Sequence, residues 1–438
     1  MKNNISKWQI TLLVLFVLFA GMVTQTNVAS SKADKKNDYK QGKVYTITPK
    51  SKPLKESGYG EGFKYYNSKT RQYLTILSYM EKFEKDGKGT LVFKKGTYTI
   101  THAVFVPSNV TIILEKGAKL VKGTSSGIAA FPASGSMFQC IRPSRAGKKN
   151  VYGKHKGEKN IHFVGKGNAT INLKNKKKSI GIIMGHNKNV TVDGIHFKNL
   201  NDGHFLEVDA SQNVKITNCK FSNAKNGSDY VKEAINIDTP DKSTGGFNSA
   251  WSKHDKTGND NVLIDSCEFN NLGRAIGTHK YSCKGNKQVY HTKIVITNNR
   301  INNSKYDSPI RVMNWKKSTI ADNQFDTIKA KGDNRGMFVS GAVDVSIKNN
   351  LFVDMKKAFQ CIAWKNSGAG SKYPITYNKF TKQNLKDMET NVGWRLSSGE
   401  YFIRINKKYK VYSNAQKIKI KNYEEETKTP EPVPAPVQ

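Results

Sequence analysis

Apolar and polar residues alternate in a short pattern that recurs between residues 188 and 365. Each copy opens on a polar residue, continues with aliphatic residues at every second position, and closes on Phe or Ile. The closing residues lie 24, 48, 32, 24 and 27 positions apart, at Phe197, Phe221, Phe269, Ile301, Phe325 and Phe352. Alternation over so few residues predicts strands, and a repeat in the twenties predicts a solenoid of stacked coils.

The residue types decide which solenoid this is. The copies are too short for helical repeats, and Leu is too rare at fixed positions for a leucine-rich repeat. We therefore expect an all-β fold, a single-stranded right-handed parallel β-helix with about three short strands in each coil. At one corner, Asn299, Asn323 and Asn350 should form an asparagine ladder. Cys219 and Cys267 share that column, and we expect stacked thiols there rather than a disulfide.

The repeat is flanked by segments with other patterns. Residues 70–84 have helical character, and this helix should cap the open end of the solenoid, where strand edges would otherwise be exposed. The predicted organisation is a signal peptide over 1–33, an N-terminal extension over 34–59, the β-helix with its N-terminal helical cap over 60–372, a C-terminal cap over 373–423 and a disordered tail over 424–438. The chain is thus expected to form one capped solenoid.

The first 33 residues have the pattern of a secretory signal peptide. Lys2 and Lys7 precede an apolar run from Ile10 to Val23, and small residues follow at Ala29–Ser31. The run is shorter than the roughly 20 apolar residues of a membrane span, so an uncleaved anchor is the weaker alternative. We expect a secreted, extracellular protein with no membrane segment after cleavage, which its positive charge could hold at the cell surface.

Charge narrows the choice of partner. The chain has 438 residues, 72 Lys and Arg against 34 Asp and Glu, and a formal net charge of +38, which indicates an anionic partner. Export favours an acidic polysaccharide and argues against intracellular nucleic acid, for which no recognition motif is present. Five cysteines exclude a disulfide-stapled scaffold, and no Cys/His spacing suits zinc. We expect the protein to be a monomer.

A second strand pattern recurs at residues 204–210, 233–239, 274–280 and 308–314. Because successive side chains alternate between faces, its aliphatic residues should point inward and its polar residues outward. Coils stack about 4.8 Å apart, which brings outward residues of successive coils into columns. Three columns are predicted: His204, Glu233 and Arg274; Glu207, Asn236, Gly277 and Arg311; Asp209, Asp238 and His279.

Acidic, basic and histidine residues converge on this strand, whereas other outward faces carry mainly Lys, Asn, Ser and Thr. Repulsion between Asp209 and Asp238 should raise one pKa toward the range of a general acid. The candidate catalytic residues are Asp209, Asp238, His279 and Arg311. The candidate substrate-binding residues are His204, Glu207, Glu233, Asn236, Arg274, Lys280, Trp251 and Asn314. Trp251 belongs to the long link 240–260, where its ring could stack on a sugar or simply pin the loop.

These residues carry a family resemblance. Over residues 60–370 the repeat and its cap resemble the pectin-lyase-like superfamily of right-handed parallel β-helices. Asp209, Asp238 in Asn-Ile-Asp-Thr, His279 in Gly-Thr-His-Lys and Arg311 in Ile-Arg-Val are similar in order to the motifs of polygalacturonase-type glycoside hydrolases. That family's paired Asp, the Gly residues flanking its His and the Lys after its Arg are absent here. Its relatives also include lyases, epimerases and sugar-binding adhesins.

The leading hypothesis is a secreted polysaccharide-degrading enzyme, a glycoside hydrolase acting on an acidic extracellular or cell-surface glycan. Asp209 and Asp238 would share the acid and base roles, and Arg311 with Lys280 would hold a substrate carboxylate or sulfate. One alternative is a polysaccharide lyase, in which Arg311 or His279 abstracts a proton and the acidic cluster holds Ca²⁺. The other is a non-catalytic glycan-binding surface protein. No cofactor or metal is predicted, except Ca²⁺ for the lyase.

Overall fold

The computed structural model describes residues 39–225, 232–285, 287–328, 334–363, 377–397, 401–404 and 417–423. The predicted signal peptide (1–33) and the predicted disordered tail (424–438) lie outside these residues. Within the described ranges, no helix is long and apolar enough to cross a membrane.

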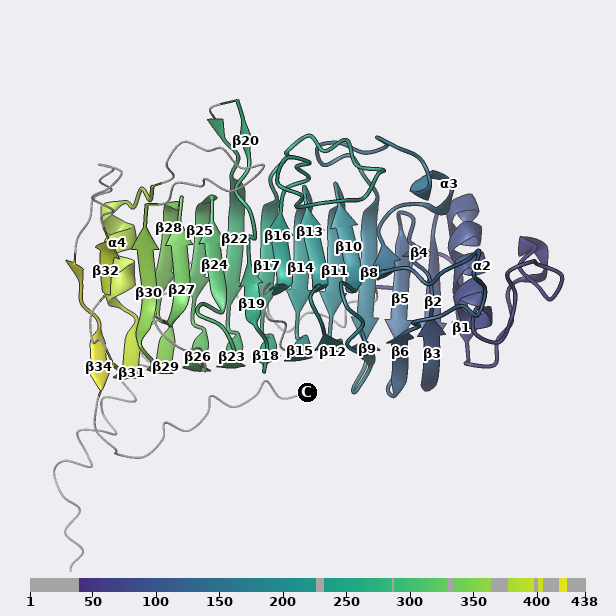
Figure 1. Ribbon diagram of the computed structural model, residues 1–438, viewed down its shortest axis with the longest axis horizontal. Coiled ribbons are helices and arrows are strands. Elements are labelled where there is room, and N and C mark those ends of the chain that lie inside the picture. The colour runs from purple at the N-terminus through teal and green to yellow at the C-terminus, as the bar shows by residue number, and fades with distance from the viewer. Residues whose placement is uncertain are drawn as a thin grey trace, which may run out of the picture. The chain divides into compact units, whose positions relative to one another are not determined.

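The described strands form three large sheets, to which successive coils contribute one strand each (Figure 1). Sheet A contains β1 (Val44–Ile47), β2 (Gly89–Phe93), β5 (Val110–Leu114), β8 (Lys159–Gly165), β11 (Lys188–Asp193), β14 (Gln212–Thr217), β17 (Asp260–Asp265), β22 (His291–Thr297), β25 (Trp315–Ala321) and β28 (Val343–Lys348). Sheet B contains β3 (Gly96–Ile100), β6 (Ala118–Lys122), β9 (Thr170–Asn172), β12 (His196–Leu200), β15 (Lys220–Ala224), β18 (Glu268–Asn270), β23 (Arg300–Ser304), β26 (Gln324–Ile328), β29 (Leu351–Met355), β31 (Val392–Leu396) and β34 (Lys421–Tyr423).

Sheet C carries the second strand pattern. It contains β4 (Val104–Phe105), β7 (Ser136–Gln139), β10 (Ile180–Gly185), β13 (His204–Asp209), β16 (Glu233–Asp238), β19 (Arg274–Gly277), β24 (Ile310–Met313), β27 (Arg335–Ser340), β30 (Lys357–Ile362), β32 (Tyr401–Arg404) and β33 (Lys417–Ile418). The strands of each sheet pair in parallel, except β32 with β33, and β20 (Cys283–Lys284) and β21 (Lys287–Gln288) form a separate antiparallel hairpin. The chain runs through sheets A, B and C in turn, so the predicted right-handed parallel β-helix is confirmed.

Each copy of the sequence repeat spans a strand of sheet A, a sharp corner and the start of a strand of sheet B. The corner residue has a positive φ, for example 53° at Asn218, 54° at Asn298 and 53° at Asn349. Asn, Asp and Gly tolerate this left-handed conformation better than other residues, which explains why they recur at this position, three residues before the closing Phe or Ile, in all copies but the one with Ser266.

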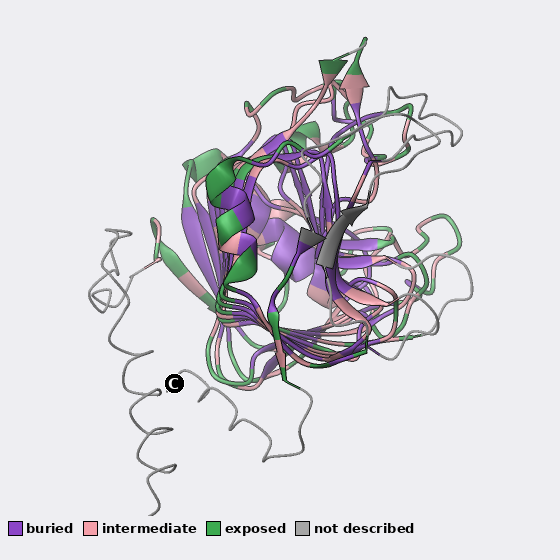
Figure 2. Ribbon diagram, turned by 90° about the vertical axis from the view of Figure 1, so that its left-hand side faces the viewer, coloured by how far each residue is buried: buried purple, intermediate pink, exposed green. Residues whose placement is uncertain are grey.

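The interior of the coils is filled by side chains that stack from one coil to the next. Phe197, Phe221 and Phe269 form one such stack, with ring centroids 5.2 Å and 4.9 Å apart. Buried residues follow the three sheets, and exposed residues gather at corners and loops (Figure 2). Cys219 and Cys267 are buried free thiols, as expected.

The predicted asparagine ladder is present and is buried. Asn299 Nδ2 donates to Asn323 Oδ1 at 2.9 Å, and Asn323 Nδ2 donates to Asn350 Oδ1 at 2.9 Å. The ladder continues one coil further than predicted, because Asn350 Nδ2 donates to Asn391 Oδ1 at 2.8 Å. Each Oδ1 also accepts the backbone amide of the preceding asparagine, so the ladder satisfies the polar groups of a buried corner.

Helices complete the fold: η1 (Lys55–Ser57), α2 (Arg71–Asp86), α3 (Pro143–Ala146) and α4 (Lys382–Glu389). The apolar side of α2 contributes Leu74, Ile76 and Met80 to the solenoid core, so the predicted helical cap is confirmed. Residues 44–47, inside the predicted extension, already form the first strand of sheet A. Within the predicted C-terminal cap, β31 and β34 continue sheet B, and α4 packs on β28.

Candidate functional site

The register of sheet C determines which candidate residues are neighbours. β13 and β16 pair so that Asp209 lies beside Asp238. The next pairings place Asn236 beside Gly277 and Gly277 beside Arg311. A Cβ atom on Gly277 would lie 2.8 Å from both the Cβ and the carbonyl oxygen of Arg311, so this position admits no larger residue without rearrangement.

Asp209 and Asp238 are both 0% exposed. Neither carboxylate oxygen of Asp209 has a hydrogen-bond partner among the described residues, and Asp238 has one bond, accepted by Oδ1 from the Thr239 amide at 2.9 Å. Burial, followed by the neighbouring acidic groups, raises the pKa of both carboxyls well above the ordinary value. A hydrolytic pair must contact a glycosidic bond and a water molecule, and burial prevents both contacts in this conformation.

Two loops pack on this part of sheet C, and we call them together the cover: residues 141–157 and residues 239–258. The loops pair with each other, because the Val151 amide donates to a carbonyl oxygen of the second loop at 2.7 Å and the Lys253 amide donates to the first loop at 2.8 Å. At Gly246 the cover approaches Asp238, since a Cβ atom on this glycine would lie 3.3 Å from an oxygen of that carboxylate.

Trp251 attaches the cover to sheet C. Its ring is 2% exposed and packs against Phe247, while Nε1 donates to Gln139 Oε1 at 2.9 Å. Gly185, one coil before Asp209, provides the space: a Cβ atom there would lie 2.5 Å from the Trp251 ring and 2.7 Å from the Phe247 ring. This corrects the substrate-binding assignment of Trp251, because a ring without a free face pins the loop and cannot stack on a sugar.

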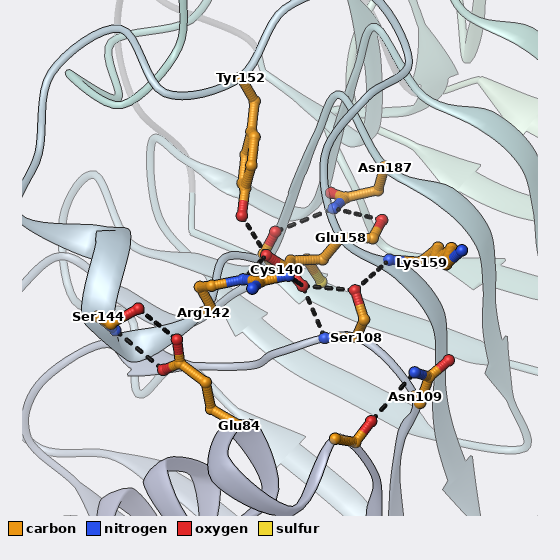
Figure 3. A network of polar contacts seen from close by, with 11 residues as sticks. Glu84, Ser108, Asn109, Cys140, Arg142, Ser144, Tyr152, Glu158, Lys159 and Asn187 are labelled. Atoms are coloured by element: carbon orange, nitrogen blue, oxygen red, sulfur yellow. Dashed lines mark hydrogen bonds and ion pairs between the residues drawn. The ribbon is translucent and has the colours of Figure 1, made fainter.

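The base of the first loop of the cover is tied together by the buried carboxylate of Glu158 (Figure 3). It accepts hydrogen bonds from the Ser108 amide at 2.8 Å, from Arg142 Nε at 2.7 Å and from the Tyr152 hydroxyl. Burial would raise the pKa of Glu158, but Arg142, Ser108 and Tyr152 outweigh burial and lower it. Glu158 is therefore a paired structural anion, unlike the carboxylates beneath the cover.

Three further candidates are buried on β13 and β16. His204 donates from Nδ1 to the Glu233 carbonyl oxygen at 2.5 Å, and burial lowers its pKa to about 4. Burial raises the pKa of Glu207 to about 8, although Lys232 opposes the change. The Oδ1 atom of Asn236 has no partner among the described residues. These side chains lie in the predicted columns, but little of their surface is available to a ligand.

His279 departs from its predicted column. It lies two residues beyond the end of β19, and its Nδ1 is 3.5 Å from Glu233 Oε2 rather than beside Asp238. Arg274 Nη1 is 3.4 Å from the other oxygen of Glu233. Burial opposes the charge of Glu233, but His279 and then Arg274 outweigh it and hold the pKa of this carboxyl below its usual range. The His279 side chain is 20% exposed, so the imidazole is both oriented and accessible.

Asp307 and Arg335 belong to the same cluster and were not identified from the sequence. Asp307 pairs with Arg274 at 3.3 Å and with Arg335 at 2.8 Å, and Arg335 Nη1 donates to Gln360 Oε1 at 2.5 Å. Gln360 lies two coils beyond Arg311 in one column, so extending the second strand pattern past residue 314 would have found it. Asp307 precedes β24 in a link without a repeating pattern, and no sequence signal marks it.

Three arginines of this region lie over aromatic rings. The guanidinium carbon of Arg274 is 4.9 Å from the ring centroid of Tyr306, and those of Arg335 and Arg311 are 5.3 Å and 5.8 Å from the centroid of Phe338. We call these five residues the arginine surface. The Arg311 side chain makes no hydrogen bond or ion pair with the described residues; the residue is partly buried, and burial lowers its pKa.

The two remaining candidates lie at the ends of strands. Lys280 follows His279 and is half-buried. Asn314 is buried with a φ of 55°, and its backbone amide donates to Ser340 at 3.1 Å while its carbonyl accepts the His291 amide at 2.8 Å. Asn314 thus forms the turn between β24 and β25, and its side-chain amide atoms have no hydrogen-bond partner among the described residues, so its substrate-binding assignment stays a prediction. In the part of the chain that the structure describes, no group of three or more His, Cys, Asp or Glu residues is arranged to hold a metal ion.

Strand order and parallel pairing place the protein among the right-handed parallel β-helices, and comparisons with known proteins agree. No family model matches the chain. Plasmin and fibronectin-binding protein A of Streptococcus pneumoniae is 27% identical over 280 residues, which are 59% of this chain and 37% of that protein. The chain therefore matches little more than a third of that relative's length.

Solved structures give the same architecture. The crystal structure of PfbA, a surface adhesin of Streptococcus pneumoniae, has a TM-score of 0.55 at 20% identity and covers 83% of this chain and 79% of that chain. An iota-carrageenase complexed to iota-carrageenan fragments has a TM-score of 0.40 at 13% identity, covering 79% of this chain and 65% of that chain. The likeness to the adhesin shows the fold, and it leaves function to be argued from the side chains.

Proposed function

We propose that the protein is an extracellular surface protein that binds an anionic ligand without cleaving it, and that the arginine surface is its binding site. The observation that carries this proposal is the burial of Asp209 and Asp238. A general acid and its partner must reach the scissile bond, and these carboxyls are 0% exposed beneath the cover. A binding protein has no such requirement. This reading takes the place of the hydrolase that the sequence alone favours.

The chemistry of the arginine surface supports an anionic ligand. A guanidinium held against an aromatic ring keeps its planar set of donors free, and such donors match a carboxylate or sulfate in two parallel bonds. Arg311 contributes this group, and Tyr306, which is 43% exposed, adds a ring that a sugar or an apolar side chain can cover. The net charge of +38 attracts anionic polymers from a distance.

The relatives support a surface location and suggest the ligands to be tested. One relative is named for binding plasmin and fibronectin, and one solved neighbour is a surface adhesin. We therefore include these two host proteins with acidic polysaccharides as candidate ligands.

The test measures binding of the secreted chain to immobilised fibronectin, plasmin and a sulfated glycan at low and high salt. Arg311→Ala should weaken binding about 10- to 100-fold, because a hydrogen-bonded ion pair contributes about 1.5–3 kcal/mol. Lys119→Ala is the matched control: Lys119 is an exposed cation on sheet B, and its loss should change affinity little. Equal effects of the two substitutions would assign binding to overall charge and refute the arginine surface as the site.

One observation favours a second candidate, a glycan-cleaving enzyme. His279 is oriented by the ionised Glu233 and is partly exposed beside Arg311, which is the arrangement of a positioned base next to a carboxylate-binding group. A panel of acidic glycans, with and without chelator, separates the possibilities. Unsaturated products absorbing in the ultraviolet would identify a lyase, new reducing ends alone a hydrolase, and neither a binding protein. Loss of product formation in His279→Ala would assign the activity to this residue.

A further inference from the structure

Two of the acidic groups beneath the cover, Asp209 and Asp238, form no ion pair with the described residues. Glu233 and Asp241 have ion-pair partners in Arg274 and Lys256, at 3.4 Å and 3.7 Å. The acidic groups that face Asp209 and Asp238 are Glu207 on β13, Glu233 on β16 and Asp241 in the cover. Further titratable groups around this contact are Lys232, His155, His186, Lys242, His254, Asp255 and Lys256.

The contact between the cover and sheet C has an apolar part and a polar part. Its apolar part is a cluster of buried residues that is separate from the solenoid core and consists of Ile141, Ile183, Phe247 and Trp251, against which Phe105, Ala146, Val151, Tyr152 and Ile180 also pack. The polar part includes the bond from Trp251 to Gln139 and those of His186. A segment attached in this way can open while the coils beneath it stay folded.

His186 is buried and contacts both loops of the cover, and burial favours its neutral ring. Its Nδ1 lies 2.6 Å from the Lys154 carbonyl oxygen, and its Nε2 lies 2.8 Å from the Ser252 hydroxyl. Because a carbonyl only accepts, Nδ1 carries the proton and Nε2 accepts the hydroxyl hydrogen of Ser252. His186 thus joins both loops of the cover to the end of β10. A second proton on this ring would reverse the bond to Ser252, with Nε2 donating to the hydroxyl oxygen, and would place a positive charge in a buried site.

We propose that the cover is a pH-dependent gate that is closed while Asp209 and Asp238 are protonated and opens when they ionise. A protonated carboxyl can be buried at moderate cost, whereas an ionised one next to another carboxylate and without a partner cannot. In the open state water would reach both groups, and they would titrate as ordinary aspartates. Opening would extend the accessible face of sheet C from the arginine surface to β13 and β16.

The direction of the pH dependence follows from the raised pKa values. When a carboxyl has a higher pKa in the closed state than in the open state, its proton stabilises the closed state. This stabilisation is fully present at pH values below the ordinary carboxyl pKa, and it is lost as the pH rises through the closed-state pKa. The opening constant is the equilibrium ratio of open to closed cover. If opening releases one proton, this constant rises up to about tenfold per pH unit, and if opening releases two protons it rises up to about 100-fold. Burial lowers the pKa of His186, which sets a separate limit at acid pH, where its protonation would weaken the closed state.

Hydrogen exchange of the secreted chain tests this gate without any binding readout, so its outcome is independent of the proposed function. Exchange of amides in the cover is measured from about pH 5 to about pH 9 and corrected for the intrinsic rate, with sheet A amides as the internal reference. The slope of the logarithm of the opening constant against pH equals the number of protons released on opening. It should fall by about one in Asp209→Asn and by about one more in Asp209→Asn/Asp238→Asn. Asp322→Asn, which neutralises an exposed carboxylate, should retain the wild-type slope.

Two results would overturn the proposal. One is a wild-type slope of zero, and the other is a double variant with the wild-type slope. An infrared titration of the wild type provides a second measurement that does not depend on how the variants fold. It should detect protonated carboxyl groups at neutral pH that ionise together with cover opening, and their absence at neutral pH would also contradict the gate.

Discussion

The buried asparagine ladder leads to a quantitative prediction, because the chain also contains an exposed ladder of the same residue type. In the buried ladder, Asn323 Oδ1 accepts from the amide and the side chain of Asn299, and Asn323 Nδ2 donates to the carbonyl oxygens of Ile296 and Ala321. In the exposed ladder, Asn213 exchanges one side-chain bond with each neighbour, donating at 3.0 Å and accepting at 2.8 Å. The two ladders therefore differ in their access to water and in the backbone hydrogen bonds that Asn323 makes.

Asn323→Ala should destabilise its coil by about 2–6 kcal/mol. The substitution leaves at least two buried polar groups without this partner, the Asn299 amide and a carbonyl oxygen, and each unsatisfied buried group costs about 1–3 kcal/mol. Asn213→Gly is the control, because Gly accepts the φ of 57° at this position and water replaces the lost bonds. Its cost should stay below about 1 kcal/mol.

The assay is native-state hydrogen exchange at the Asn299 amide, combined with the denaturant midpoint of each variant. Protection at Asn299 should fall in Asn323→Ala and remain unchanged in Asn213→Gly. If both substitutions shift the midpoint equally, or if Asn323→Ala costs less than about 1 kcal/mol, the ladder does not stabilise the fold by satisfying buried polar groups, and the reasoning fails.

Three further predictions concern the cover, the charged cluster and the cysteines. Gly185→Ala should increase proteolysis of the 239–258 loop, because the new methyl would lie 2.5 Å from the Trp251 ring; unchanged cleavage contradicts this contact. Because the pKa of Glu233 is lowered, its ion pairs stabilise the fold at pH values above the ordinary carboxyl pKa, and this stabilisation is lost as the pH falls through the lowered pKa. The melting temperature of Glu233→Gln should therefore change less at acid pH than that of the wild type. Alkylation after unfolding without reductant should modify all five cysteines, and a smaller mass increase would reveal a disulfide.

The fold was predictable because a solenoid repeats the same physical requirement in every coil. Inward residues such as Ile235 and Ile276 lie in register, and corner residues such as Asn323 stack. The sequence therefore contains several examples of each position in the coil, and each example indicates the same local structure. The neighbouring arrangement of Asp209 and Asp238 follows from the same period. The strands, corners and register could therefore be predicted from the sequence because they recur in each coil.

The environment of the candidate site could not be predicted, because it depends on segments that do not repeat. The cover forms when residues 141–157 pair with residues 239–258, about a hundred positions later, and neither loop has a period that would indicate the pairing. His279 was misplaced for a similar reason: β19 ends at Gly277, so the alternation of side chains stops before it reaches the histidine. Asp307, which joins Arg274 to Arg335, also lies outside any strand.

Burial of the acidic groups changes what the net charge means for function. The formal value of +38 counts all 34 acidic residues as ionised, yet burial raises the pKa of Glu207, Asp209 and Asp238. Each of these that keeps its proton makes the folded protein more positive than the formula indicates. Glu233, the ionised carboxylate nearest to His279, is balanced by Arg274. At physiological salt, charges act over a Debye length of about 8 Å, so an anion approaching the arginine surface is attracted without repulsion from a free carboxylate on β13 or β16. A hydrolase needs a carboxyl that reaches its substrate, whereas an anion-binding protein benefits from hiding one.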